Sequence, residues 1–366
     1  KRNIPASGLM KLSGVKTTES LTDSQGNNLN NVNVFWDDAN NPLSYEQFIT
    51  VLNAAMSSAN RFTAPVKSGV LGNIPTDLYQ LNTSITAPIT YNFSVAADGV
   101  TRPFNVINPD FIDNGYFFER HPDPTNLFNL IYRNDGLGLS SKNTGFFVMF
   151  KQGTLQFKDF DYTLSLQNRE ETISDLNINE IDVYLQEINT AGLPLSKWEK
   201  VPNTVGQTLN YNSVSKGTKN LYAVENVDNG GIKLKFSDGN FGNSPYGVYR
   251  LWYRTSDPTR YVLQPENVRN VSIVVPYVDK QNKNQALTLT FKLEYRVNNS
   301  LPAESLNAIK RRAPQVYYTQ NRMVSAQDYN VFPLSQSNNI LKLKAINKTH
   351  AGHSRYIDIN DPTGTY

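Results

Sequence analysis

The side chains that could carry chemistry in this chain do not gather into a catalytic or metal-binding set. His350 and His353 have a spacing that metal ligands can take, but the chain contains no cysteine, no convincing third ligand accompanies the pair, and a glycine between them loosens the geometry. The remaining histidine, His121, is flanked by Arg120 and Pro122 in a turn-like segment, which favours a surface position over a catalytic one. We therefore predict no metal site and no cofactor.

Two pairs of carboxylates, Glu170 with Glu171 and Asp159 with Asp161, have the residue types that glycoside hydrolysis uses. Nothing in the sequence shows that either pair flanks a sugar-binding cleft, so a solvated strand edge or loop is the expected setting. The chain also lacks a Gly-x-Ser-x-Gly motif, a phosphate-binding loop and a His-Glu-x-x-His motif. We predict no catalytic residues and a protein that is not an enzyme.

The glycine-rich segments are incomplete as ligand sites. Segment 136–138 lacks the third glycine and the strand-to-helix setting of a dinucleotide-binding loop. Segments 228–231 and 237–240 could offer oxygens to calcium, but neither has the trailing glutamate of a calcium loop. Hairpin turns account for both.

Length and composition limit the class of protein. At 366 residues the chain exceeds the size at which one core stops growing, and 39% hydrophobic content supports two or three domains. The absence of cysteine fits assembly in a reducing cytoplasm, and a net charge of +3 with scattered basic residues predicts no nucleic-acid surface. No apolar run reaches membrane-spanning length and the first residues lack a signal peptide, so no membrane contact is expected. The two ends have no obvious terminal element, which predicts an internal part of a longer protein.

Composition along the chain predicts an α+β, multi-domain protein with a β-rich middle. Residues 1–43 are polar and asparagine-rich and are expected to form an extended arm. Ser44 and Gln47 form a capping box that begins an amphipathic helix, placed in an α+β domain over 44–154. The apolar stripe of this helix favours packing on its own domain over binding a partner helix. A β-rich domain over 155–300 and a module of two helices and a strand over 301–366 complete the prediction.

Alternation of apolar and polar residues predicts most of the strands. The clearest case is 287–297, where every second side chain from Leu287 to Val297 is apolar. Shorter runs predict strands at 89–95, 145–150, 164–166, 181–185 and 341–346.

A hairpin is predicted around 231–255. Apolar residues alternate before the turn and again after it, and the segment Asp238, Gly239 and Gly242 is expected to form the structural turn. Both glycines are predicted to take positive φ, where other residues would be strained.

Near the end of the chain, Leu306, Ile309 and Ala313 recur at helical spacing. This helix is expected to end before the next proline, which places Arg311 and Arg312 in its last turn, at the negative end of the helix dipole. Two interpretations of these cations remain open, a solvated cap or contact with acidic groups of a neighbouring subunit.

An exposed connector is predicted over 315–322, followed by a second short helix. The connector carries Tyr317, Tyr318 and Arg322, the residue types most enriched at interface hot spots. We predict that these three residues, with the two preceding arginines, form an interface. The alternative is that both tyrosines pack on their own sheet.

The second helix has a clear start signal. Ser325 is followed three residues later by Asp328, which is typical of an N-cap hydroxyl with an acidic partner, and Pro333 is expected to end the helix.

These motifs resemble those of the baseplate J-like wedge proteins of contractile-tailed bacteriophages. In that family a helix ending in Arg-x-Ala-Pro is followed by Arg-x-Val-[Ser/Thr]-x-x-Asp-Tyr, matched here from Arg311 to Tyr329. Upstream lies the family's Gly-Asp-Gly-x-x-Gly hairpin and a strand ending in Tyr-Arg, with Ser237 replacing the first glycine. The similarity covers about residues 155 to 350.

The resemblance implies a structural baseplate wedge subunit that joins wedges into a ring around the hub and relays baseplate rearrangement to sheath contraction. Its expected partners are other wedge subunits and further copies of itself, within the virion tail and assembled in the host cytoplasm. Two alternatives remain open: a tail-associated carbohydrate-binding or depolymerising protein, and a subunit of a related contractile injection machine outside a phage.

Overall fold

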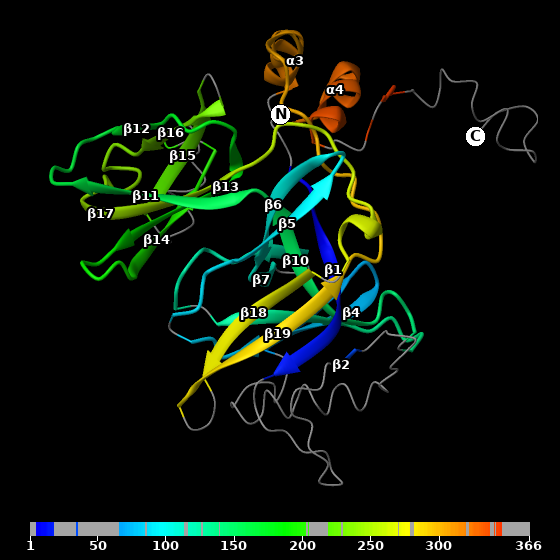
Figure 1. Cartoon of the computed structure of the whole chain (residues 1–366). Coiled ribbons are helices and arrows are strands. Elements are labelled where there is room, and N and C mark those ends of the chain that lie inside the picture. Colours follow the sequence, from blue (N-terminus) through cyan, green and yellow to red (C-terminus); the bar gives the residue numbers. More distant parts are fainter. Residues whose placement is uncertain are drawn as a thin grey trace, which may run out of the picture. The chain divides into compact units, whose positions relative to one another are not determined.

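The computed structural model describes residues 5–17, 34–35, 66–84, 86–112, 116–125, 127–138, 140–202, 204, 219–227, 230–269, 271–278, 282–319, 322–336, 340 and 342–345. The chain divides into two compact units, one that extends to Pro302 and one that begins at Ala303. Strands build the first unit and two helices belong to the second (Figure 1). The described chain is therefore strand-rich with a C-terminal helix pair, as the sequence predicts at that coarse level.

A ten-stranded sheet formed by the described residues dominates the first unit. Neighbouring strands along its main path run in the order β18, β19, β1, β10, β9, β4 and β3, while β6 pairs with β10 and β5, and β2 pairs with β1. Figure 1 shows β18 and β19 beside β1, although they come from opposite ends of the unit. The strands are β1 (Ser7–Thr17), β2 (Val34–Phe35), β3 (Lys67–Leu71), β4 (Ile74–Leu81), β5 (Tyr91–Ala97), β6 (Val100–Ile107), β9 (Phe128–Arg133), β10 (Gly145–Gln152), β18 (Val271–Val278) and β19 (Asn284–Lys292).

This sheet curls around one large core. A bridge between Thr83 and Tyr277 joins the chain after β4 to β18, which brings the sheet's distant strands together. The short pair β7 (Pro109–Ile112) and β8 (Tyr116–Glu119) contributes Phe111 and Phe117 to a smaller cluster with Leu78. Apolar side chains alternate into the main core because successive residues of a strand point to opposite faces; they include Met10, Leu12, Val95, Phe104, Leu130, Phe150, Val275, Leu289 and Phe291.

A second, seven-stranded sheet is inserted between β10 and β18 in the sequence. Its order is β11, β17, β13, β14, β15, β16 and β12, and it encloses a core that includes Tyr162, Trp198 and Phe236. All its pairings are antiparallel except that of β14 with β15. The strands are β11 (Thr154–Tyr162), β12 (Glu170–Ile173), β13 (Ile178–Ile188), β14 (Pro194–Lys200), β15 (Leu221–Asn226), β16 (Ile232–Phe236) and β17 (Gly247–Thr255).

The chain leaves and re-enters the first sheet at neighbouring points. Thr154, at the start of the inserted sheet, pairs with Thr255 at its end. Gly153 precedes this pair with a φ of 115°, and a Cβ there would lie 2.3 Å from the carbonyl oxygen of Thr255. Only glycine fits this exit, because any side chain would meet backbone and the φ is one that other residues rarely adopt.

Several predicted strands differ from the observed ones. Segment 164–166 is a loop whose two leucines are exposed, and no strand occurs at the described residues 342–345. The periodic segment 287–297 is a strand only to Lys292, although Leu293 is still buried. Alternation therefore predicted the buried face correctly as far as Leu293, but not the end of the strand, and Tyr295, expected on the same face, is 52% exposed. The predictions at 89–95, 145–150 and 181–185 fall within β5, β10 and β13 or one to two residues from their ends.

The start of the chain is integrated into the sheet. Residues Ser7–Thr17, which the sequence places in a polar arm, form β1, an interior strand between β10 and β19. Its few apolar side chains suffice because its neighbours supply the rest of the core. The predicted helix that begins at Ser44 lies outside the described residues.

Both helices of the second unit continue through a proline. α3 (Leu306–Thr319) contains Pro314 and α4 (Ala326–Gln336) contains Pro333, so the prediction that each proline ends its helix was wrong. Proline removes one backbone donor and is unfavourable inside a helix, but it does not forbid one.

The predicted start of α4 is confirmed. The backbone N–H of Asp328 donates to the Ser325 hydroxyl at 3.2 Å, and the N–H of Ser325 donates to the Asp328 carboxylate at 2.7 Å. This reciprocal arrangement is a capping box.

Candidate functional site

The residues predicted to form an interface lie on and just after α3. Tyr317 and Tyr318 are 76% and 79% exposed, on the last turn of the helix and not in a connector. Arg311 and Arg312 lie inside the helix and not at its end. Arg312 is tied within its own unit, because it pairs with Glu304 and donates to the carbonyl oxygen of Leu334 at 3.4 Å.

The helix pair leaves much of its apolar surface exposed, although Val331, Phe332 and Leu334 are half-buried. Among the described residues from 303 onward, Thr319 is the one that is buried. Within the helix pair itself, Tyr317 and Tyr318 pack on no sheet. Exposed apolar side chains of this size at one place are typical of interaction surfaces; they are Leu306, Ile309, Val316, Tyr317, Tyr318, Met323, Val324 and Tyr329.

The predicted turn is a ten-residue loop, 237–246, between β16 and β17. Asp238 accepts hydrogen bonds from the backbone N–H groups of Phe241 and Asn240 at 3.0 and 2.9 Å, and these donors lower its pKa. Gly239 has a φ of 87°, as predicted. Gly242 does not have positive φ, so that prediction was wrong.

Gly242 is needed for a different reason. A Cβ at this position would lie 2.9 Å from the Cβ of Ser237 and 3.1 Å from the carbonyl oxygen of Lys219. The loop therefore packs against its own base without room for a side chain.

A buried cluster of four charges lies where the inserted sheet joins the first sheet. Arg254, at the end of β17, has no exposed surface and donates to Glu119 at 2.6 Å and to Asp182 at 3.2 Å. Lys151 of β10 donates to the other oxygens of the same carboxylates, at 2.9 Å to Glu119 and 2.6 Å to Asp182. Asn105 of β6 accepts the third donor group of Arg254. Two cations and two anions thus connect strands of both sheets.

The cluster is electrostatically self-consistent. Burial alone would raise the pKa of Asp182, but Lys151 and Arg254 outweigh burial and lower it. Burial alone would lower the pKa values of Lys151 and Arg254, but the Glu119 and Asp182 carboxylates outweigh it and raise both. Asp182, Lys151 and Arg254 therefore stay charged at neutral pH, and each lies beside opposite charge as burial requires.

Sequence reasoning missed this cluster. Its members come from four strands that are distant in the sequence, and each resembles an ordinary surface charge. The available signal was Arg254, a cation directly after the run of apolar and aromatic residues in β17, at the Tyr-Arg end of the hairpin motif.

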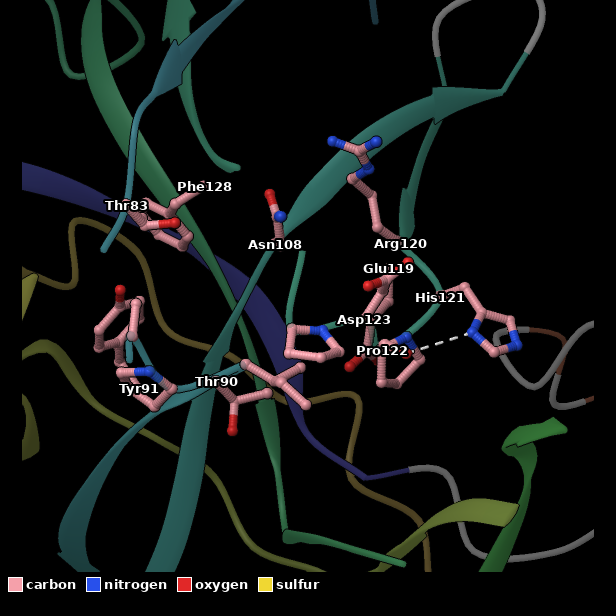
Figure 2. Close-up of a pocket in the computed structure, with 14 residues that line it drawn as sticks. Thr83, Thr90, Tyr91, Asn108, Glu119, Arg120, His121, Pro122, Asp123 and Phe128 are labelled. Carbon is pink, nitrogen blue, oxygen red and sulfur yellow. Dashed lines mark hydrogen bonds between the residues drawn. The ribbon is translucent and has the colours of Figure 1, made fainter. Parts of the chain in front are cut away.

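Beside the cluster lies a small pocket, shown in Figure 2, where Tyr91 and Thr83 face Glu119 and Asp123 across it. Its volume of about 20 Å³ has room for about one water molecule and not for an organic substrate.

His121, expected at the surface, is partly buried at this pocket. One ring nitrogen lies 3.3 Å from the carbonyl oxygen of Leu185, and the ring contacts that of Tyr184 edge to face. Burial lowers the pKa of His121, which favours the neutral ring. His121 therefore lies in the junction between the sheets and not at the surface, where the sequence predicted it.

The other candidate residues have structural surroundings. Glu170 pairs with Lys233, and Asp159 pairs with Arg250. Within the described part of the chain, no three metal-ligating side chains come together, and His350 and His353 lie outside it. None of the helices in the described ranges is both long and apolar enough to cross a membrane.

By its fold, the protein is strand-rich, with a second sheet inserted into the first. The chain belongs to the family described as domain of unknown function DUF8360, whose sequence profile matches residues 8–296. No curated protein and no solved structure matches it.

Proposed function

We propose that the chain is a structural wedge subunit of a contractile-tail baseplate, with the helix pair as an interface to other subunits. The observation that carries this proposal is the exposure of the helix pair's apolar and aromatic side chains, in the segment that bears the wedge-like motifs. The described helices leave many large apolar side chains exposed, and a partner that covers them would add stability.

The charge of this segment narrows the kind of partner. Lys310 and Arg311 are adjacent on α3 and Arg322 follows it, while Arg312 already pairs with Glu304. Aromatic and arginine side chains are the residue types that most often dominate binding energy at interfaces. The partner surface is therefore apolar and acidic, either on another wedge protein or on a further copy of this chain.

The inserted sheet supports a role in assembly. Two chain connections that lie side by side and a buried charge cluster join it to the first sheet, which suits a subunit that must hold several contact surfaces in a fixed geometry. We propose a multi-domain subunit located in the virion baseplate on this basis.

The test compares Tyr318→Ala and Arg322→Ala with the unmodified full chain by sedimentation velocity over a range of concentrations. Both variants should remain folded by circular dichroism and should weaken self-association by about tenfold or more, as expected for hot-spot residues. The matched control is Tyr116→Ala, because Tyr116 is a similarly exposed tyrosine on β8.

Two results would count against the proposal. A chain that stays monomeric at all concentrations, alone and with the neighbouring tail proteins of its genome, has no such interface. Normal assembly of both variants would place the interface elsewhere.

A further inference from the structure

A groove of about 390 Å³ opens at one end of the inserted sheet. Glu187 of β13, Trp198 of β14 and Tyr249 of β17 form its base, and Asn220, Asn243 and Tyr246 come from the segments that flank β15 and β17. Its volume lies within the range of small-molecule sites. Neither the assembly role nor the family description assigns it a purpose.

Hydrogen bonds fix the polar side of the groove. The Asn243 side chain donates to Asn220 Oδ1 at 2.7 Å, and the Asn220 amide lies 3.5 Å from the Ser196 hydroxyl. That hydroxyl donates to Glu187 Oε2 at 2.8 Å. This relay holds two amides and a carboxylate in set positions, so a ligand would meet a site that is already organised.

Contacts with neighbouring residues also hold the aromatic side of the groove in place. Tyr246 is 64% exposed, and its backbone N–H and carbonyl both lie within hydrogen-bond distance of the Tyr249 hydroxyl, at 3.3 and 3.4 Å. Tyr249 packs edge to face on Trp198, whose indole N–H has no hydrogen-bond partner among the residues that the structure describes. An exposed ring on a rigid base gives a ligand a flat apolar face to contact.

The lining chemistry selects one class of ligand. No lysine or arginine is among the described residues that line the groove, so it does not suit phosphate, sulfate or a sugar acid. One carboxylate cannot supply the six or more oxygens of a calcium site. Its many polar groups also do not suit a lipid tail.

We propose that this groove binds a neutral saccharide. Sugar hydroxyls can donate to the Glu187 carboxylate and accept from the asparagine amides, while the C–H face of the ring lies on Tyr246. The binding is non-covalent and does not depend on the assembly role.

The experiment titrates the full chain with D-glucose, D-galactose, D-mannose, N-acetyl-D-glucosamine, maltose and lactose. Saturation-transfer NMR and tryptophan fluorescence report binding, and at least one sugar should saturate in the millimolar range. Tyr246→Ala and Glu187→Gln should each weaken that binding by about tenfold. Tyr116→Ala and Glu199→Gln, which change exposed residues outside the groove, should leave it unchanged.

Three outcomes would overturn the proposal: no saturable binding of any sugar, binding that both groove variants retain, or equal binding of D-glucuronate and inorganic phosphate. Loss of sugar binding with normal sedimentation would separate this site from the assembly interface.

Discussion

Replacing Arg254 with methionine should destabilise the chain far more than the same change at Arg250. Both arginines lie on β17, two positions either side of Trp252 and therefore on the same face. Arg254 is fully buried against Glu119 and Asp182, whereas Arg250 and its partner Asp159 both retain exposed surface. The two variants carry the same substitution on the same strand, so they differ in whether the ion pair that is lost was buried or at the surface.

The magnitude follows from what each change leaves behind. Arg254→Met leaves two buried carboxylates with Lys151 as their remaining cation, and removal of one partner from a buried pair costs about 3–5 kcal/mol. Arg250→Met leaves Asp159 able to contact water, so the expected loss is about 0–1 kcal/mol. The difference between the variants should be about 2 kcal/mol or more.

Guanidinium denaturation of the full chain, followed by tryptophan fluorescence, measures both free energies of unfolding. The double variant Arg254→Met with Glu119→Gln separates charge from packing, because it removes the excess negative charge without restoring the lost contacts. It should be more stable than Arg254→Met alone. Equal losses for Arg254→Met and Arg250→Met would refute the reasoning, and a double variant that is less stable would show that packing dominates.

Two further outcomes are expected. The pKa of Asp182 is depressed in the folded chain, so its contribution to stability is present above its unfolded pKa of about 3.9 and is lost as pH falls through the lower folded value. Acid unfolding, followed by circular dichroism, should therefore begin below about pH 4 in the unmodified chain and at higher pH in Arg254→Met. Unfolding profiles that coincide for the two proteins would contradict this. In the 237–246 loop, Gly239→Ala should lower the free energy of unfolding by about 1–2 kcal/mol, because residue 239 has positive φ. Gly242→Ala should lower it by about 1–3 kcal/mol, because the new Cβ would clash with Ser237 and Lys219. Thermal unfolding measures both losses, and an unchanged unfolding temperature in either variant would contradict the reason given for that glycine.

Features set by neighbouring residues could be predicted from the sequence. The capping box of Ser325 and Asp328 needs only a four-residue segment, and the buried face of β19 needs only alternation. Helix ends were less predictable, because Pro314 biases the backbone against a helix by an amount that the rest of α3 can offset.

Features set by contacts between distant segments could not be predicted. Nothing near β18 and β19 in the sequence shows that they join β1 and not the strands that precede them. The charge cluster has the same origin, since Glu119 of β8 and Arg254 of β17 are distant in the sequence and meet only in the folded chain. In the candidate site, residue types indicated an interface, but the exposure of Tyr317 and Tyr318 had to be observed.

The insertion of one sheet within another also determines the order in which the protein can form during synthesis. Strands β11 to β17 are contiguous and leave the ribosome as a complete set, so their sheet can fold while the chain is still growing. The first sheet must wait, because Leu12 of β1 pairs with Phe291 of β19. Until β19 has been synthesised, the edge of β1 that pairs with β19 can form hydrogen bonds with any other extended segment in the cell. Nascent chains of this protein therefore expose an unpaired strand edge that the finished molecule covers with β19.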